Sequence, residues 1–193
     1  MNVCIVGLGR AGRFHLHSIQ QIDGVELKYV VDPGLEQGDI SGDYKLLTDI
    51  EAALQDEDLD AVIVSCPTGF HYDYITRSLQ AGKHVFAEKP LGKTVNEIRT
   101  CYRLAAGQRR ALYLGFQRRY DQNFQTLKAQ IPALGQIRTI KTSSRDNPKP
   151  SLDYLRISGN IFHDMLIHDF DMLLFLLGTY TPKSVFAHGH AYD

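Results

Sequence analysis

A lysine stands directly after a short apolar run in the first half of the chain. Residues His84–Ala87 indicate a buried strand, and Glu88, Lys89 and Pro90 follow it. Because proline disfavours helical backbone in the residue before it, Lys89 is expected to be extended, with its ammonium projecting from the carboxyl end of the strand. Ligands bind at that end in open α/β sheets. Lys89 is therefore a candidate proton carrier or anion clamp, although a solvated loop lysine is the simpler interpretation of this stretch by itself.

A second set of reactive side chains lies in a long apolar stretch, Ile161–Leu177, which predicts a helix. Asp164 and His168 are four residues apart, so they should be neighbours on one face, where the carboxylate would raise the pKa of the imidazole and fix its tautomer. Such a pair is a plausible general acid/base. A structural ion pair is an equal alternative. A metal site with His163 would need ligands from elsewhere, and we assign none.

A glycine-rich turn follows the first predicted strand, Asn2–Val6, and precedes a pattern compatible with a helix. In the run Gly7-Leu8-Gly9-Arg10-Ala11-Gly12, the first glycine permits a tight turn and the second lets backbone approach a pyrophosphate. The third, Gly12, allows close packing of helix on strand. The N-terminus of the helix would then present N–H groups and partial positive charge to the phosphates.

An acidic residue completes this dinucleotide fingerprint. The next predicted strand, Val25–Val31, ends at Asp32, twenty residues after Gly12. Asp32 would accept hydrogen bonds from the ribose hydroxyls and would repel a 2′-phosphate, which favours NAD over NADP. A glycine-rich turn without a ligand is the alternative.

Strand and helix patterns alternate up to about residue 118, which demands a mostly parallel, doubly wound sheet. The further strands, helices and loop of this part are expected at Pro33–Tyr44 (loop), Thr48–Leu54 (helix with a capping box), Ala61–Ser65 (strand), Thr68–Ala81 (helix capped by Thr68), Thr94–Ala106 (helix with a capping box) and Ala111–Gly115 (strand). His71, in the first turn of its helix, is either a surface residue or a cofactor contact.

The alternation stops after Arg118. The second part is expected to contain Phe124–Gln130 (helix), Gln136–Ser144 (alternating strand), Arg145–Ser158 (loop), the helix Ile161–Leu177 and Ser184–Ala191 (strand). We therefore expect an α/β fold, with an N-terminal Rossmann dinucleotide-binding domain over residues 1–118. A partial α+β domain for substrate binding and oligomerisation would cover residues 119–193.

Composition excludes several classes of protein. The 193 residues are 44% hydrophobic and 22% charged with a net charge of -1, as in an ordinary globular protein, so nothing points to nucleic acid. There is no basic leader and no apolar stretch of membrane-spanning length, so secretion and membrane insertion are not expected. The three cysteines have no metal-type spacing, which indicates reduced core residues of a cytoplasmic protein.

Several motifs recur together in one order. They are Gly7-x-Gly9-x-x-Gly12, Asp32, Pro67-Thr68-x-x-His71, Gly82-Lys83-His84-Val85 with Glu88-Lys89-Pro90, Gly115-Phe116-Gln117-Arg118-Arg119-Tyr120-Asp121, Ser144-Arg145-Asp146 and Asp164-x-x-x-His168. Across essentially its whole length the chain resembles the glucose-fructose oxidoreductase / inositol dehydrogenase superfamily, and within it the inositol 2-dehydrogenases most. The resemblance implies NAD-dependent oxidation of a secondary alcohol on a cyclic polyol or sugar, by a homo-oligomer.

The resemblance also implies roles for individual residues. Lys89, Asp164 and His168 match the catalytic lysine, aspartate and histidine of the family. The residues that match its cofactor side are Gly7, Gly9, Arg10, Ala11, Gly12, Asp32, Pro67, Thr68, His71 and Glu88. We expect His168, held by Asp164, to be the base that takes the hydroxyl proton, with Lys89 on the same oxygen. A cationic lysine nearby would also oppose protonation of His168.

Two features depart from the family. Its members are longer and close the second domain with a large open sheet, so the strand Ser184–Ala191 would leave an exposed edge here unless another chain covers it. The resemblance thus implies a natural short relative, a truncated product or a fragment that needs a partner. The family also tends to have two glycines where Ser158-Gly159-Asn160 stands, although Asn160 can still cap the helix. A non-catalytic dinucleotide-binding module, serving as sensor or subunit, is therefore the competing function.

Overall fold

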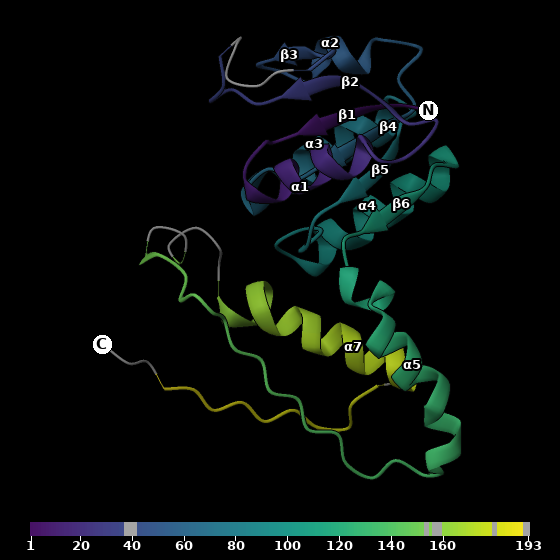
Figure 1. Ribbon diagram of the computed structural model, residues 1–193, viewed down its shortest axis with the longest axis vertical. Helices are drawn as coiled ribbons and strands as arrows, with labels where there is room; N and C mark the ends of the chain where they lie inside the picture. Colours follow the sequence, from purple (N-terminus) through teal and green to yellow (C-terminus); the bar gives the residue numbers. More distant parts are fainter. Residues whose placement is uncertain (37–41, 153–154, 156–159, 179–180, 191–193) are drawn as a thin grey trace.

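Six parallel strands form one open sheet in the computed structural model, which describes residues 1–36, 42–152, 155, 160–178 and 181–190. The strands are β1 (Asn2–Val6), β2 (Glu26–Val31), β3 (Lys45–Leu47), β4 (Ala61–Val64), β5 (His84–Ala87) and β6 (Leu112–Leu114). Their order is β3-β2-β1-β4-β5-β6, and every neighbouring pair is parallel. The predicted doubly wound Rossmann sheet is confirmed (Figure 1).

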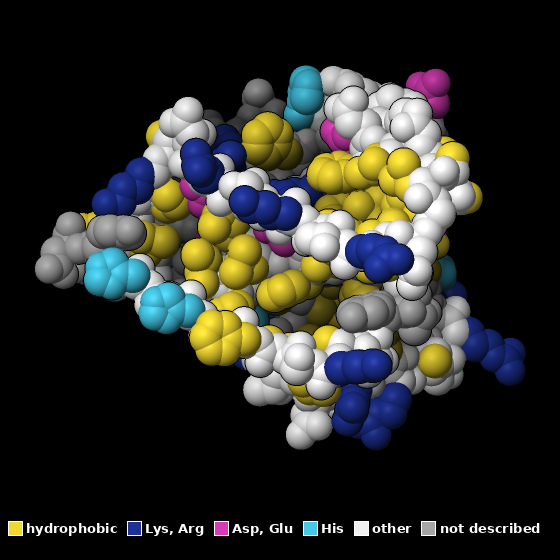
Figure 2. All heavy atoms as spheres, turned by 90° about the horizontal axis from the view of Figure 1, so that it is seen from below, with side chains coloured by type: hydrophobic (Ala, Val, Ile, Leu, Met, Phe, Trp, Pro, Cys, Tyr) yellow, Lys and Arg dark blue, Asp and Glu magenta, His cyan; other side chains and the backbone are white. Residues whose placement is uncertain are grey.

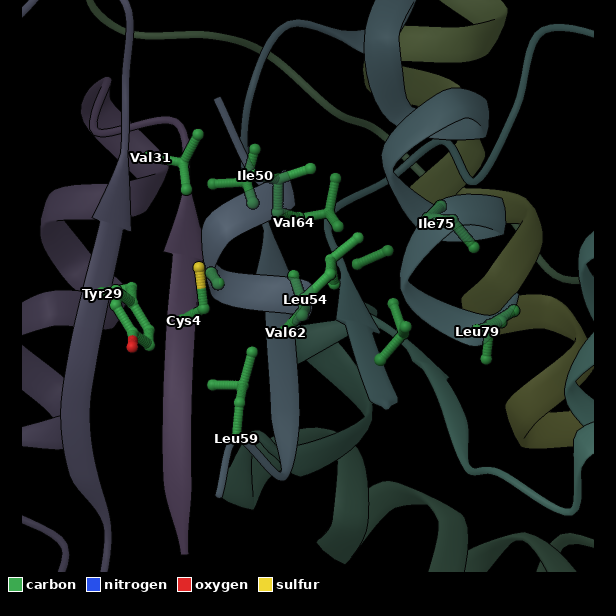
Figure 3. Packing of buried hydrophobic residues seen from close by; sticks show 14 of the residues in the cluster. Cys4, Tyr29, Val31, Ile50, Leu54, Leu59, Val62, Val64, Ile75 and Leu79 are labelled. Atoms are coloured by element: carbon green, nitrogen blue, oxygen red, sulfur yellow. The ribbon is translucent and has the colours of Figure 1, made fainter. Parts of the chain in front are cut away.

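Helices cover both faces of the sheet. They are α1 (Arg10–Ile19), α2 (Glu51–Leu54), α3 (His71–Gln80) and α4 (Val95–Gln108). Because successive side chains of a strand point to opposite faces, β1 divides its residues between two cores. Ile5 packs in the cluster under α1, whereas Cys4 and Val6 pack in the larger cluster with α2, α3 and α4. Figure 3 shows this larger cluster, with Ile75 of α3 facing the strands.

One of the three predicted caps of this part is confirmed. The Thr94 hydroxyl accepts from Glu97 N at 3.2 Å, and the Glu97 carboxylate accepts in turn from Thr94 N, so the capping box at the start of α4 exists. The box predicted at residues 48–51 is wrong, because Asp49 Oδ1 accepts from Glu51 N instead. The Thr68 cap is wrong too, because Thr68 opens a 3₁₀ turn (η1, Thr68–Phe70) that delays α3.

The predicted loop Pro33–Tyr44 agrees with its described residues, 33–36 and 42–44, which contain no helix or strand. Residues 37–41 lie outside the described part of the chain.

The second part of the molecule contains fewer regular elements. They are η2 (Gln117–Tyr120), α5 (Gln122–Gln130), η3 (Ile131–Leu134), a π-helical turn η4 (Phe162–Leu166) and α7 (Ile167–Leu177). Asp121 caps α5 by accepting from Asn123 N and Phe124 N. The Asn160 side chain accepts from the N–H groups of Phe162 and His163, as expected. In Figure 1 these helices lie below the sheet, with long irregular stretches around them.

The two strands predicted for this part are wrong. Residues 136–144 and 184–190 have no strand structure, and residue 191 lies outside the described range. Alternation of apolar and polar residues becomes a strand only when another strand completes the hydrogen-bond ladder. No described residue provides that ladder here. In the predicted loop Arg145–Ser158, Leu155 N donates to Ser151 O in a helical turn, and residues 153–154 and 156–158 are outside the description.

Large apolar side chains remain exposed in the second part. Leu174 of α7 is 45% exposed, Val185 82% and Phe186 91%. Viewed from below, the molecule is hollowed, and hydrophobic side chains gather in the hollow while Lys, Arg and His side chains lie around it (Figure 2). No helix within the described residues has both the length and the apolar character needed to cross a membrane.

Candidate active site

Parallel pairing brings the predicted residues to one edge of the sheet. Gly7 follows β1, Asp32 follows β2, Cys66 comes two residues after β4, and Glu88 follows β5. All carboxyl ends of parallel strands lie on the same edge, so residues far apart in sequence converge there. The glycine turn and the Glu88-Lys89-Pro90 segment therefore share one site.

Lys89 pairs with the second part of the chain. Its Nζ donates to Oδ1 of Asp164 at 2.9 Å and to the main-chain oxygen of Asp164 at 2.8 Å. Both side chains are 18% exposed, so the pair is well shielded from water. The predicted convergence of Lys89 with the Asp164 helix is thus realised, with the ammonium held by a carboxylate and a carbonyl together.

In the structure, the Asp164 side chain accepts a hydrogen bond from Lys89 and not from Nδ1 of His168. Asp164 lies in the π-helical turn η4, where hydrogen bonds close i→i+5, so side chains four apart no longer stack as in an α-helix. Oδ1 of Asp164 accepts from Lys89, and Nδ1 of His168 has no hydrogen-bond partner among the described residues. Asp164 therefore does not hold His168 through Nδ1. Single π turns inside helices are frequent at functional sites.

His168 is buried beside positive charge. It is 8% exposed, and its ring meets Phe116 edge-on with the ring centres 6.3 Å apart. Burial lowers the pKa of His168, and the charges of Lys89 and Arg118 lower it further. The predicted effect of a neighbouring lysine is confirmed, whereas the predicted rise in pKa is wrong. A lowered pKa favours the neutral imidazole, the form that a general base requires.

The glycine turn fits a dinucleotide. A Cβ on Gly12 would lie 2.0 Å from the main-chain oxygen of Gly7, so only glycine lets α1 pack this closely on β1. Gly7 has φ +85°, a conformation that favours glycine. A Cβ on Gly9 would meet nothing within 4 Å, so the turn is open where a phosphate would approach. Arg10 and Ala11 form the first turn of α1, with Arg10 exposed.

Asp32 is tied to the glycine turn. Its Oδ2 accepts from Leu8 N at 2.8 Å, and its Oδ1 accepts from Gly34 N at 2.9 Å. Each carboxylate oxygen has a second lone pair, so the carboxylate can still accept from ribose hydroxyls. The residues present therefore fit the adenosine end of NAD.

His15 of α1 is a site residue that the sequence interpretation missed. Its Nε2 lies 2.8 Å from Oε1 of Glu88, and its ring packs edge-on against Phe86. Burial alone would raise the pKa of Glu88, but the hydrogen bond and charge of His15, together with Lys89, hold that pKa below its ordinary value. The two residues are 73 positions apart, and no spacing rule links a lone helical histidine to a strand that distant.

His71 is not the surface histidine that was one of the two predictions for it. It is 1% exposed, and its two ring nitrogens lie within hydrogen-bond distance of the main-chain oxygens of Cys66 and Pro90. It is therefore a buried residue engaged with protein backbone, and its contact with the cofactor stays a prediction. Pro67 and Thr68 lie at the carboxyl edge in and before η1, where Pro67 is exposed and Thr68 half-buried.

Two further carboxylates of α7 hold the helix against the rest of the chain. Asp171, 5% exposed, accepts from Arg119 through both nitrogens Nε and Nη2, at 2.6 to 3.0 Å. Asp169 accepts from the Ser144 hydroxyl and lies 3.7 Å from Arg118. The sequence analysis placed Arg118, Arg119 and Ser144 in motifs but predicted neither pair. No group of three or more metal-ligating side chains occurs within the described ranges.

Comparison with protein families gives two matches that divide the chain. Residues 1–116 match a family described as an oxidoreductase family with an NAD-binding Rossmann fold. Residues 124–193 match the GFO/IDH/MocA C-terminal domain.

Individual relatives point the same way. An inositol 2-dehydrogenase of Rhizobium meliloti (strain 1021) is 37% identical over 191 residues, which are 95% of this chain and 56% of the relative. A myo-inositol 2-dehydrogenase of Thermotoga maritima is 34% identical over 195 residues, covering 98% of this chain and 58% of the relative. The chain thus spans about half the length of the curated relatives it matches.

A solved structure shares the arrangement in space. The scyllo-inositol dehydrogenase of Lactobacillus casei, solved with NAD(H) and scyllo-inositol bound, superposes with a TM-score of 0.72 at 26% identity. The match covers 91% of this chain and 55% of that one.

Proposed function

This chain belongs to the GFO/IDH/MocA family of oxidoreductases with an NAD-binding Rossmann fold, and on that premise we propose that it forms the NAD-binding and catalytic part of a polyol dehydrogenase. The reaction is oxidation of a secondary alcohol on an inositol-like ring or a sugar. The names of the most similar relatives support an inositol.

The observation that carries the proposal is the Lys89–Asp164 pair at the carboxyl edge of the sheet, with His168 on the following turn. Oxidation of an alcohol needs a group that takes the hydroxyl proton while the hydride leaves the carbon. His168, whose pKa is lowered by burial and by the charges of Lys89 and Arg118, is our choice for that base. Lys89 gives two of its three N–H donors to Asp164, and the third stabilises negative charge developing on the substrate oxygen.

The cofactor-binding residues are those of the glycine turn, with Gly7, Gly9, Arg10, Ala11 and Gly12 around the pyrophosphate and Asp32 on the adenosine ribose. Bound NAD supplies the hydride acceptor. Glu88 lies beside Lys89 on the nicotinamide side, and Pro67 and Thr68 border the same edge. His71 contributes to this side of the site by contacting the main-chain oxygens of Pro90 and Cys66.

Hydride transfer is tested by mixing the purified chain with NAD and a panel of inositols and sugars and following absorbance of the reduced nicotinamide. We expect NAD to bind and at least one cyclic polyol to reduce it. If NAD binds but no polyol reduces it, the dehydrogenase proposal is refuted, and the non-catalytic dinucleotide-binding module is the function that remains.

Cofactor choice is tested separately with Asp32→Ala. We expect weaker NAD binding and relaxed discrimination against NADP, because the ribose acceptor and the charge that repels a 2′-phosphate are both lost. An unchanged preference would count against the role of Asp32.

We also propose a domain boundary, a cellular location and an oligomeric state for the chain. We place the boundary between a dinucleotide-binding domain and a partial substrate domain at residue 118, and we expect a cytoplasmic homo-oligomer. The free thiols of Cys4, Cys66 and Cys101 and the exposed apolar side chains of the second part support this. The native mass in solution measures the assembly.

A further inference from the structure

His71 bridges the turns that follow two adjacent strands. Its Nδ1 lies 2.7 Å from the main-chain oxygen of Pro90, in the turn after β5, and its Nε2 lies 2.8 Å from that of Cys66, in the turn after β4. The strands themselves are paired in parallel, with Val64 opposite Ala87 at their carboxyl ends. The imidazole thus fastens the first turn of α3 to both turns of the site.

The chemistry of the two contacts fixes which partner donates. A carbonyl oxygen only accepts, so each contact is a hydrogen bond when the ring nitrogen in it carries a proton. His71 is 1% exposed, and the ring excludes water from the contact with Pro90. Without the ring, a buried carbonyl next to Lys89 would lose its partner, which is costly enough to move the turn.

Lys89 is therefore held from two directions. Its ammonium is fixed by Asp164 from the second part of the chain, and the residue that follows it, Pro90, is fixed by His71 from α3. Asp164 alone leaves the backbone of Lys89 free to shift, because a four-carbon side chain can keep its end in place over several backbone positions. A fixed backbone is what sets the direction of the third N–H donor.

We propose that His71 is a positioning residue for Lys89, acting through its hydrogen bond to the Pro90 carbonyl. This rests on the function proposed above. The role of the Cys66 contact is to orient the ring, whereas the Pro90 contact determines where the lysine stands during proton transfer.

Two substitutions separate the contacts. In His71→Asn the amide nitrogen can replace Nδ1 and keep the bond to Pro90, while in His71→Gln it can replace Nε2 and donate to Cys66 instead. A neutral imidazole carries one proton and donates to only one of the two carbonyls, so with the proton on Nδ1 only His71→Gln loses the bond to Pro90. We expect His71→Gln to lower kcat about 10-fold to 100-fold, the scale of a misplaced catalytic group. His71→Asn should keep kcat within about threefold, and KM for NAD should change little in either.

His17→Asn is the matched control, because His17 is exposed on α1 and pairs only with Gln21 within the described residues. It should leave kcat unchanged. Equal loss of kcat in His71→Asn and His71→Gln, or a larger loss in His71→Asn, would overturn the proposal.

A measurement without turnover keeps this result distinct from failure of the proposed function. In nitrogen–proton correlation NMR of the ligand-free chain, we expect a proton on Nδ1 of His71. Relaxation of the Lys89 amide should show greater mobility in His71→Gln than in His71→Asn. An unprotonated Nδ1, or equal Lys89 mobility in the two variants, would refute the positioning role whether or not the chain turns over a polyol.

Discussion

Lys89 and His168 derive their chemistry from different surroundings. Lys89 donates hydrogen bonds to Asp164, whereas Nδ1 of His168 has no hydrogen-bond partner in the part of the chain that the structure describes, and His168 is governed by burial and nearby charge. A lysine whose ammonium is fixed in this way suits charge stabilisation, and a buried neutral imidazole suits proton abstraction. These two roles make different predictions.

Replacing Lys89 should affect turnover far more than cofactor binding. Lys89→Ala removes the donor to the substrate oxygen, so we expect kcat to fall by about 10²-fold to 10⁴-fold. The glycine turn and Asp32 are untouched, so the Kd for NAD, measured by calorimetry, should stay within a few fold. Lys93→Ala, an exposed lysine in the same loop, is the control. A large loss of NAD binding with normal turnover at saturation would exclude the role.

The pH profile should report His168. Its pKa lies below the ordinary 6.5, and the deprotonated form is the base, so kcat/KM should rise with pH along a limb centred below 6.5. Arg118→Gln removes a positive charge that lowers this pKa, so the limb should move to higher pH. Arg110→Gln, near Gly82 and the amino ends of the strands, should leave the limb in place. A limb of kcat/KM centred above pH 6.5, or a limb that does not move in Arg118→Gln, would contradict the assignment of His168 as the base.

Among the elements, β5 and α1 are joined by a side-chain pair as well as by the core. Phe86 and Glu88 alternate with the buried Val85 and Ala87, so they point toward the face that α1 covers. His15 contacts both of them from α1. The helix that carries the glycine turn is thereby connected to the strand that carries Lys89.

Removing this connection should raise the pKa of Glu88. His15→Phe keeps a ring against Phe86 but removes the hydrogen bond and charge that counter burial. Because the folded-state pKa is below 4.5, the pair contributes stability above that pH, and the contribution is lost as pH falls through the folded value. In the variant this pH-dependent loss should shrink. Carbon NMR of the Glu88 carboxyl and unfolding at two pH values measure it, with His17→Phe as control.

At the scale of the whole molecule, polar contacts hold α7 in place. Lys89–Asp164 joins the segment that contains η4 and α7 to the Rossmann part, and Arg119–Asp171 joins α7 to η2 within the second part, while large apolar side chains there remain exposed. Both pairs therefore contribute to the position of α7 beside the site.

A double-mutant cycle should detect this in Arg119 and Asp171. Asp171 is buried, so Arg119→Ala leaves its carboxylate short of donors, and we expect a coupling of about 1 to 2 kcal/mol, moderated because Arg119 is itself 41% exposed. The exposed Arg77–Asp73 pair is the comparison and should couple by less than about 0.5 kcal/mol. Equal coupling in the two pairs, measured by denaturant unfolding, would show that the Arg119–Asp171 pair has no special role.

The sequence by itself determined the Rossmann half. Glycine spacing, an acid at the end of the second strand and alternating apolar runs are local signals, and the strands Asn2–Val6 and His84–Ala87 have the bounds they predict. The family resemblance, stated from the same motifs, is confirmed by the family matches.

Only the tertiary structure decided which reactive side chains meet. The π turn moves Asp164 from His168 to Lys89, and His71 and His15 find partners 19 and 73 residues away. Two alternating segments, 136–144 and 184–190, form no strand because a strand needs a neighbour, and pairing is a property of the assembled fold. Local signals specify elements, whereas contacts over long sequence separations depend on how those elements pack.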